Sequence, residues 1–285
     1  MTDNRISRAF ARGKAFIPFV TSGDPDLATT EALVRAMVAA GADLVELGLP
    51  FSDPVAEGPV IEAASARALA GGVKLEHHFE LVARLRADLD VPLVFMTYYN
   101  PIFAHGVESF LERAAAVGLD GLIVPDLPFE ERAELADPCR RHGLSLISLV
   151  APTSAGRVAA IAAQAEGFLY CVSSLGVTGV RDSLGDQAAQ LVAQARPATK
   201  IPCAVGFGIA TPDQAKAVAR FADGVIVGSA IVRLVAEHGR AAVPVVRDYV
   251  AAMRGALGWV FPVQMGANAD LETVCSNSSG HLRTL

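Results

Sequence analysis

Two glutamates are the residues best placed for catalysis, and both lie in the segment Glu46–Pro59 (ELGLPFSDPVAEGP). Glu46 stands in an apolar run with Val45 and Leu47 beside it, so we expect a buried strand whose glutamate points into a pocket. Burial disfavours the charged form of a carboxylate and raises its pKa into the range useful for proton transfer. A core ion pair is the alternative interpretation.

Glu57 is the second acid, and it lies in a loop whose path is fixed by two prolines and two glycines. This loop is expected to cross the mouth of the same pocket and to bring Glu57 near Glu46. Two carboxylates in different environments can divide the acid and base roles of one turnover. The pair therefore predicts acid–base catalysis.

Glycine-containing turns follow two of the later apolar runs and predict an anion site. The runs end in Ala204–Ile209 (AVGFGI) and Ile226–Ala230 (IVGSA), and a helical stretch follows each. Gly208 and Gly228 would let the backbone approach an anion, the free amides of a helix start would attract it, and Ser229 adds a hydroxyl donor. In barrels, the loops after strands seven and eight commonly bind phosphate. Tight turns without a ligand are the alternative.

Other polar and aromatic residues give weaker signals. Thr178 lies in the loop Gly176–Gly179, which is either a lid or a plain loop. Tyr170 is either a pocket residue or a core aromatic, and Asp126 either bonds a neighbouring loop or caps a helix. The six histidines, including His78, show no metal-ligand spacing, so we expect no metal site and place them at the surface.

A repeating pattern of strands and helices has to position these residues. Acidic turns at Asp43, Asp120 and Asp223 precede three of the apolar runs, which indicates a repeated unit. Eight such units predict an α/β fold, a (β/α)8 TIM barrel with an extra helix after the second strand and its chemistry at the carboxyl ends of the strands. We expect strands at 14–20, 43–48, 92–97, 120–124, 145–150, 167–172, 201–205 and 223–227. We expect helices at 26–40, 59–70, 76–88, 107–117, 129–141, 154–165, 184–196, 211–220 and 240–256.

Composition excludes several classes of protein. The net charge of −6 without a basic run argues against nucleic acid and against anionic membrane surfaces. The first residues lack a secretory apolar region, and no apolar stretch reaches the roughly 18 residues of a membrane span, so we expect a soluble, cytoplasmic protein. Four widely spaced cysteines predict reduced, mostly buried thiols. We expect one barrel domain over 1–257 and an irregular tail over 258–285.

Six motifs occur in one order along the chain: FIPFVTSGDP (16–25), ELGLPFSDPVAEGP (46–59), MTYYNP (96–101), VPDLP (124–128), YCVSSLGVTG (170–179) and AVGFGI (204–209). Together they resemble the tryptophan synthase α subunit family over about residues 5–257. The resemblance implies a lyase of tryptophan biosynthesis that cleaves indole-3-glycerol phosphate to indole and glyceraldehyde 3-phosphate. It also implies that this chain needs no cofactor and joins a β subunit, which carries pyridoxal phosphate, in a heterotetramer.

The resemblance also implies roles for individual residues. Glu46 matches the catalytic glutamate of the family, and Glu57 matches its mouth-loop acid. Pro50 and Asp53 fall in the loop that contacts the partner. The implied substrate-binding residues are Phe19, Tyr98, Tyr170 and Phe207 around the indole, Thr178 in the lid with Asp126 as its hydrogen-bond partner, and Gly179, Gly208, Gly228 and Ser229 at the phosphate.

The chain departs from the family at Glu57, because the family motif reads A-D-G-P where this chain reads A-E-G-P. If Glu57 does the work of the aspartate from a longer stem, Glu57→Asp should preserve or raise the cleavage rate. If the loop is built around glutamate, the same change should lower the rate at least tenfold. A barrel that has lost turnover and mainly activates the β subunit, and an isomerase of another sugar phosphate, are the remaining alternatives.

Overall fold

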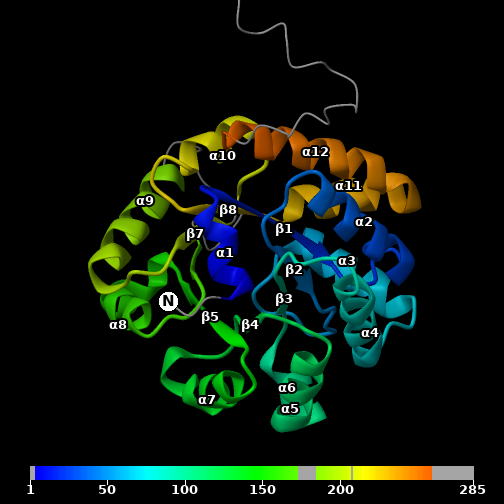
Figure 1. Cartoon of the computed structure of the whole chain (residues 1–285), viewed down its shortest axis with the longest axis horizontal. Helices are drawn as coiled ribbons and strands as arrows, with labels where there is room; N and C mark the ends of the chain where they lie inside the picture. The colour runs from blue at the N-terminus through cyan, green and yellow to red at the C-terminus, as the bar shows by residue number, and fades with distance from the viewer. Residues whose placement is uncertain (1–3, 173–183, 207, 259–285) are drawn as a thin grey trace, which may run out of the picture.

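The computed structural model describes residues 4–172, 184–206 and 208–258, in which eight parallel strands close into a barrel (Figure 1). Each strand pairs with the next along the chain, and the last pairs with the first. The expected (β/α)8 barrel is therefore confirmed. Its strands are β1 Ala15–Thr21, β2 Val45–Gly48, β3 Leu93–Met96, β4 Gly121–Ile123, β5 Ser145–Val150, β6 Leu169–Val172, β7 Cys203–Gly206 and β8 Gly224–Val227.

Helices surround the barrel, and both α3 and α4 lie between β2 and β3, which confirms the extra helix after the second strand. The α-helices are α1 Arg5–Ala11, α2 Leu27–Ala39, α3 Pro59–Ala70, α4 Leu75–Arg86, α5 Tyr99–His105, α6 Val107–Ala116, α7 Ala133–Arg141, α8 Val158–Ala163, α9 Leu184–Ala195, α10 Pro212–Val218, α11 Ser229–His238 and α12 Ala242–Ala256. Short 3₁₀ turns are η1 Phe129–Glu131, η2 Pro152–Arg157, η3 Arg196–Ala198 and η4 Gly239–Ala241.

Three helices lie outside the predicted ranges, and some of the predicted helices begin as a 3₁₀ turn. With seven residues each, α1 and α5 are too short for a helical period to show in the sequence. The start of α11 is hidden because apolar residues continue on both sides of Gly228. The helix predicted over 129–141 is split into η1 and α7, a common way for an α-helix to begin.

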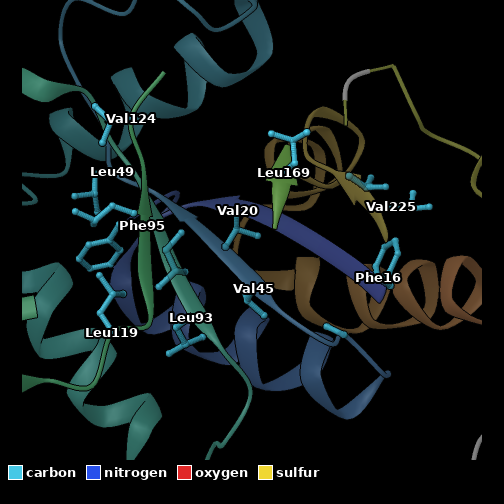
Figure 2. Close-up of a cluster of buried hydrophobic side chains, with 14 of the residues drawn as sticks. Phe16, Val20, Val45, Leu49, Leu93, Phe95, Leu119, Val124, Leu169 and Val225 are labelled. Carbon is cyan, nitrogen blue, oxygen red and sulfur yellow. The ribbon is translucent and has the colours of Figure 1, made fainter. Parts of the chain in front are cut away.

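The strands are mostly apolar because both of their faces are buried. Along β1, Ile17 packs in the cluster inside the barrel, whereas Phe16 and Val20 pack in the larger cluster between the barrel and its helices. Figure 2 shows part of that outer cluster, with Val45 and Phe95 on neighbouring strands. The alternation decides which side chains of each strand can reach the interior.

The three acidic turns noted in the sequence join neighbouring strands at the amino-terminal end of the barrel. In each case an aspartate just before one strand accepts a hydrogen bond from a backbone N–H on the preceding strand and returns one from its own N–H to the carbonyl of the same residue. We call these the aspartate–strand pairs. They are Asp43 with Phe16 (2.8 Å from N–H to carboxylate), Asp120 with Leu93 (2.9 Å) and Asp223 with Cys203 (2.8 Å).

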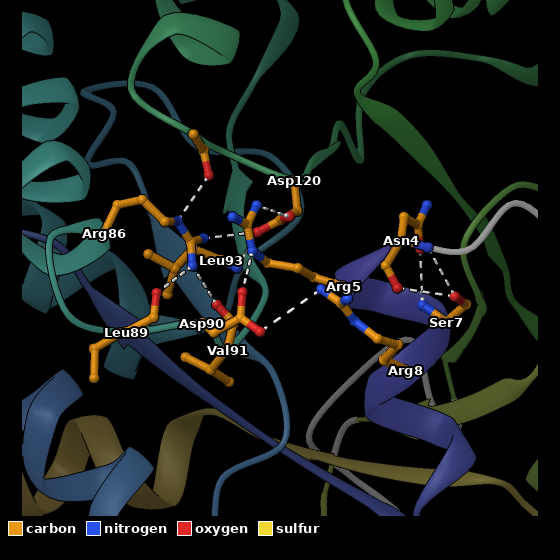
Figure 3. A network of polar contacts seen from close by, with 11 residues as sticks. Asn4, Arg5, Ser7, Arg8, Arg86, Leu89, Asp90, Val91, Leu93 and Asp120 are labelled. Atoms are coloured by element: carbon orange, nitrogen blue, oxygen red, sulfur yellow. Dashed lines mark hydrogen bonds and ion pairs between the residues drawn. The ribbon is translucent and has the colours of Figure 1, made fainter.

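An arginine meets each of these aspartates, and the Asp120 network is shown in Figure 3. Arg86 donates to Asp120 at 2.8 Å and also to the carbonyl oxygens of Leu89, Val91 and Gly118. Arg5 of α1 reaches the same aspartate at 3.2 Å. Since Ile6 is buried in the interior cluster, α1 closes this end of the barrel, and the opposite end is left for a site.

Candidate active site

A cavity of about 120 Å³ lies where the strands end, and it gathers most of the described residues singled out in the sequence. This is the carboxyl-terminal side of the barrel, as the fold predicts. Its lining combines apolar side chains, two glutamates, a serine and three glycines. The residues lining it are Phe19, Glu46, Glu57, Gly58, Ile61, Met96, Tyr170, Gly208, Ile209, Ala210, Ile226, Gly228, Ser229, Ala230 and Arg233.

Glu46 points into the barrel because its neighbours Val45 and Leu47 pack in the outer cluster. The side chain is fully buried yet lines the cavity, and neither carboxylate oxygen has a hydrogen-bond partner among the described residues. Among the described residues, no cation forms a core ion pair with Glu46. Burial without a partner raises the pKa of Glu46 to about 8, so the group is mostly protonated at pH 7.

Two aromatic rings form the apolar wall, and two glycines make room for them. The ring of Phe19 lies where a side chain at Gly48 would be, and the ring of Tyr170 lies where one at Gly206 would be. Tyr170 lies close enough to Glu46 that burial, together with the charge of that glutamate, raises the pKa of the phenol. The wall suits a flat aromatic group held next to Glu46.

Glu57 reaches the cavity from the loop between β2 and α3, and the hydroxyl of Tyr98 donates a hydrogen bond to its carboxylate. The same hydroxyl oxygen accepts the N–H groups of Val55 and Ala56 at 3.0 and 2.9 Å. Partial burial raises the pKa of Glu57, the Tyr98 bond lowers it, and the net direction is upward. Glu57 is therefore a carboxylate in a different environment from Glu46, as the sequence suggested.

The part of the cavity lined by Gly208, Gly228 and Ser229 has the features of an anion site. Gly208 has φ +75°, a conformation that favours glycine, and Gly228 precedes the first turn of α11. Ser229 is the first residue of that helix and lines the cavity, so the free N–H groups of the first turn of the helix lie beside it. Arg233 folds back along the helix, with Nε 3.4 Å from the carbonyl oxygen of Ser229. It is the only cation among the described residues lining this cavity.

Not every residue singled out in the sequence lines the cavity. Tyr98 does not line the cavity, and its hydroxyl instead donates a hydrogen bond to the carboxylate of Glu57. Asp126 accepts the N–H of Tyr99, the first residue of α5, at 2.9 Å, so it caps the start of that helix. Pro50 is half-buried and Asp53 is exposed in the mouth loop. Thr178, Gly179 and Phe207 lie outside the described residues, as does nearly all of the tail predicted over 258–285.

Sequence reasoning missed Arg233, Ile61 and Met96 among the lining residues. An arginine four residues into an amphipathic helix has the sequence signature of any solvated surface residue. Ile61 and Met96 read as ordinary core residues. The one available signal for Arg233 was its spacing from Ser229, because side chains at i and i+4 share a helix face and lean toward the helix start.

The expectation that the histidines lie at the surface is wrong for His78. It is buried in α4, and its Nδ1 lies 2.7 Å from the hydroxyl oxygen of Ser22. Burial lowers the pKa of His78 to about 4, so the ring is neutral at pH 7. The signal was present in the sequence, since His78 shares the apolar stripe of Leu81, Val82 and Leu85.

Within residues 4–172, 184–206 and 208–258, no cluster of His, Cys, Asp or Glu could hold a metal ion. None of the helices in these ranges is both long and apolar enough to span a membrane. The described cysteines Cys139, Cys171 and Cys203 are free and buried, which confirms the expectation for them.

A family model for the tryptophan synthase alpha chain matches residues 7–256. The chain is 51% identical over 231 residues to the tryptophan synthase alpha chain of Shouchella clausii, covering 81% of this chain and 86% of that one. It is 49% identical over 266 residues to that of Geobacter sulfurreducens, covering 90% and 99%.

Solved structures agree with the sequence relatives. The fold is similar to tryptophan synthase subunit alpha from Legionella pneumophila, with a TM-score of 0.82, 37% identity and coverage of 90% of this chain and 98% of that one. It is also similar to a chain of the tryptophan synthase α2β2 complex from Pyrococcus furiosus, with a TM-score of 0.80, 37% identity and coverage of 85% and 99%. This chain belongs to the tryptophan synthase alpha chain family.

Proposed function

We propose that the chain is a carbon–carbon lyase of tryptophan biosynthesis that cleaves indole-3-glycerol phosphate into indole and glyceraldehyde 3-phosphate. One observation carries the proposal: Glu46 is fully buried, has no partner among the described residues, and lines a cavity that also contains the features of an anion site. A protonated acid at neutral pH between an aromatic wall and an anion site fits this substrate. Family membership supports the same activity.

Glu46 is proposed as the acid and then the base. Its raised pKa leaves it a proton to give to C3 of the indole, which converts the ring to an indoleninium cation. The carboxylate then takes the proton of the hydroxyl on the adjacent glycerol carbon. The oxygen electrons form the aldehyde C=O, the C–C bond breaks, and its electron pair restores the neutral indole.

Glu57 is proposed to stabilise the cation formed in the first step. Its carboxylate lines the same cavity and can accept a hydrogen bond from the N–H of the indoleninium ring. The negative charge of Glu57 matters most when the ring is positive, so its contribution belongs to the transition state and not to substrate binding.

The phosphate is proposed to bind at the start of α11. Gly208, Gly228 and Ser229 present backbone and hydroxyl groups there, and Arg233 supplies a full positive charge. The resemblance also supports Thr178, Gly179 and Phe207 as substrate-binding residues. Holding this end of the substrate orients the bond that breaks, so remote binding energy serves the reaction.

The partner proposed for the chain is the tryptophan synthase β subunit, in an α2β2 assembly. The relative from Pyrococcus furiosus is described in such a complex. Pro50 and Asp53 are proposed contact residues, because they lie at the open mouth on the loop that leads to Glu57. Pyridoxal phosphate is proposed to belong to the β subunit alone, and the biosynthetic role supports a cytoplasmic location.

The decisive experiment measures indole release from indole-3-glycerol phosphate by the purified chain, with and without a β subunit. We expect turnover by the chain alone and faster turnover in the assembly. If no indole or glyceraldehyde 3-phosphate forms while β-subunit activity is still stimulated, the chain is a non-catalytic activating partner.

A further inference from the structure

We propose that the Tyr98 hydroxyl is a positioning group, which holds the Glu57 carboxylate and its loop over the cavity without touching the substrate. The inference deepens the proposed lyase function and rests on it. It also differs from the expectation that Tyr98 lies against the indole, because Tyr98 does not line the cavity.

The hydrogen bonds around the Tyr98 oxygen determine where its proton goes. The N–H groups of Val55 and Ala56 both point at this oxygen, so they occupy its acceptor sites. The phenolic O–H therefore remains free to donate, and the Glu57 carboxylate is the acceptor. A single oxygen thus ties three consecutive residues of the mouth loop to the strand-end of β3.

The ring that carries this hydroxyl is itself fixed. Tyr98 is only 2% exposed, and Phe51 stacks on it with ring centroids 5.1 Å apart. The next residue is anchored as well, because Asp126 accepts the N–H of Tyr99. The hydroxyl is therefore presented from a rigid position, which is what a group that orients a loop carboxylate requires.

The same hydrogen bond supports the charge that the proposed role of Glu57 needs. Burial and the negative charges of Glu62 and Asp126 all raise the pKa of Glu57, and Glu46 faces the same cavity. The Tyr98 bond acts in the opposite direction because it favours the ionised carboxylate. Removing the hydroxyl should raise the pKa of Glu57 further.

The length of the side chain at position 57 is part of this arrangement. Glutamate spans the distance from the loop backbone to the Tyr98 hydroxyl, and aspartate is one methylene shorter. The structure thus favours the interpretation that this loop is built around glutamate. We expect Glu57→Asp to lose the Tyr98 bond and to lower the cleavage rate at least tenfold.

The test compares Tyr98→Phe with Tyr99→Phe in the full chain. The two tyrosines are adjacent, but the Tyr99 hydroxyl pairs with Glu134 on the outside of the barrel. For each variant, kcat and KM for indole formation are measured from pH 5 to 9. We expect Tyr98→Phe to lower kcat at least tenfold and to move the acid limb of the kcat/KM profile to higher pH, and Tyr99→Phe to leave both unchanged.

Two results would overturn the inference. A Tyr98→Phe variant within twofold of the wild type, with the same pH profile, would mean that the hydroxyl positions nothing. A rise in KM with unchanged kcat and an unchanged acid limb would mean that Tyr98 contacts the substrate. Failure of the proposed function looks different, because the wild type and Tyr99→Phe would then form no indole either.

Hydrogen exchange provides a readout that does not depend on activity. In the wild type, the amides of Val55 and Ala56 should exchange slowly because Tyr98 accepts both, and Tyr98→Phe should speed their exchange. Equal exchange in both proteins would contradict the geometry. If Tyr98→Phe does not fold, Glu57→Asp tests the bond from its other end: a rate at or above that of the wild type would overturn the inference.

Discussion

The two ends of the barrel treat buried carboxylates in opposite ways. At the amino-terminal end, burial raises the pKa of Asp120, and the N–H of Leu93 and the guanidinium groups of Arg86 and Arg5 offset part of that rise by pairing with its carboxylate. At the carboxyl-terminal end, Glu46 is buried more completely and has no such partner among the described residues. The carboxylate at the amino-terminal end therefore has hydrogen-bond and ion-pair partners, whereas the acid at the carboxyl-terminal end is left without them and can take part in proton transfer.

This contrast separates the residues that stabilise the fold from those that perform chemistry. A buried charge with its full set of partners contributes to a defined structure, whereas a buried acid without partners costs stability and gains reactivity. Substitutions at the two ends should therefore have opposite consequences for activity and for the free energy of unfolding.

The largest effect is expected from Glu46→Gln. Because glutamine cannot transfer a proton, indole formation should fall by about 10²- to 10⁴-fold. Binding of glycerol 3-phosphate, measured by calorimetry, serves as the control and should be unchanged. A variant that retains more than about a tenth of the wild-type rate would exclude Glu46 from the acid role.

Arg86→Ala should show the reverse pattern at the other end. It leaves Asp120 buried with one cation fewer and frees three carbonyl oxygens, so the free energy of unfolding should fall by about 3 kcal/mol. The matched control is Arg157→Ala, whose pairing with Glu130 is exposed and should matter by less than about 1 kcal/mol. Urea unfolding gives both values. A lower kcat for folded Arg86→Ala protein would contradict the separation of the two ends.

The pH dependence of stability gives a further test of Glu46. Between its unfolded pKa near 4.5 and its folded pKa of about 8, the folded state binds a proton that the unfolded state has lost. The contribution of Glu46 to the free energy of unfolding is therefore fully present below the unfolded pKa. It falls as pH rises toward the folded pKa, by up to about 1.4 kcal/mol per pH unit. Glu46→Gln should remove this dependence. Parallel curves of unfolding free energy against pH for the wild type and Glu46→Gln would show that Glu46 does not cause the pH dependence.

Arg233→Ala should have the smallest effect, confined to the anion end of the cavity. Loss of its charge should weaken glycerol 3-phosphate binding and raise KM about fivefold to tenfold, while the affinity for indole stays the same. Arg247→Ala is the control for net charge, since Arg247 pairs with Asp248 on α12. Equal weakening by both variants would show a general charge effect and would remove Arg233 from the site.

The sequence was sufficient for the barrel because its apolar runs and acidic turns follow directly from strands buried on both faces. It was also sufficient to predict that Glu46 is buried and faces a pocket, since a carboxylate inside an apolar strand is costly to bury unless it is paired or used in chemistry. It could not predict that Tyr98 bonds Glu57, because no periodic pattern relates side chains of two different loops. Arg233 was hidden for the same reason: its role depends on which helix start faces the cavity.

The aspartate–strand pairs also bear on the order in which the chain folds. The paired residues are separated by 27 positions for Asp43 and Phe16, 27 for Asp120 and Leu93, and 20 for Asp223 and Cys203. Loops of this length lose little entropy on closing compared with the contact of Ala15 with Asp223, which joins the first and last strands of the barrel. We expect three strand–helix–strand units to gain protection from hydrogen exchange before β1 meets β8, and pulse-labelling during refolding would reveal the reverse order if barrel closure came first.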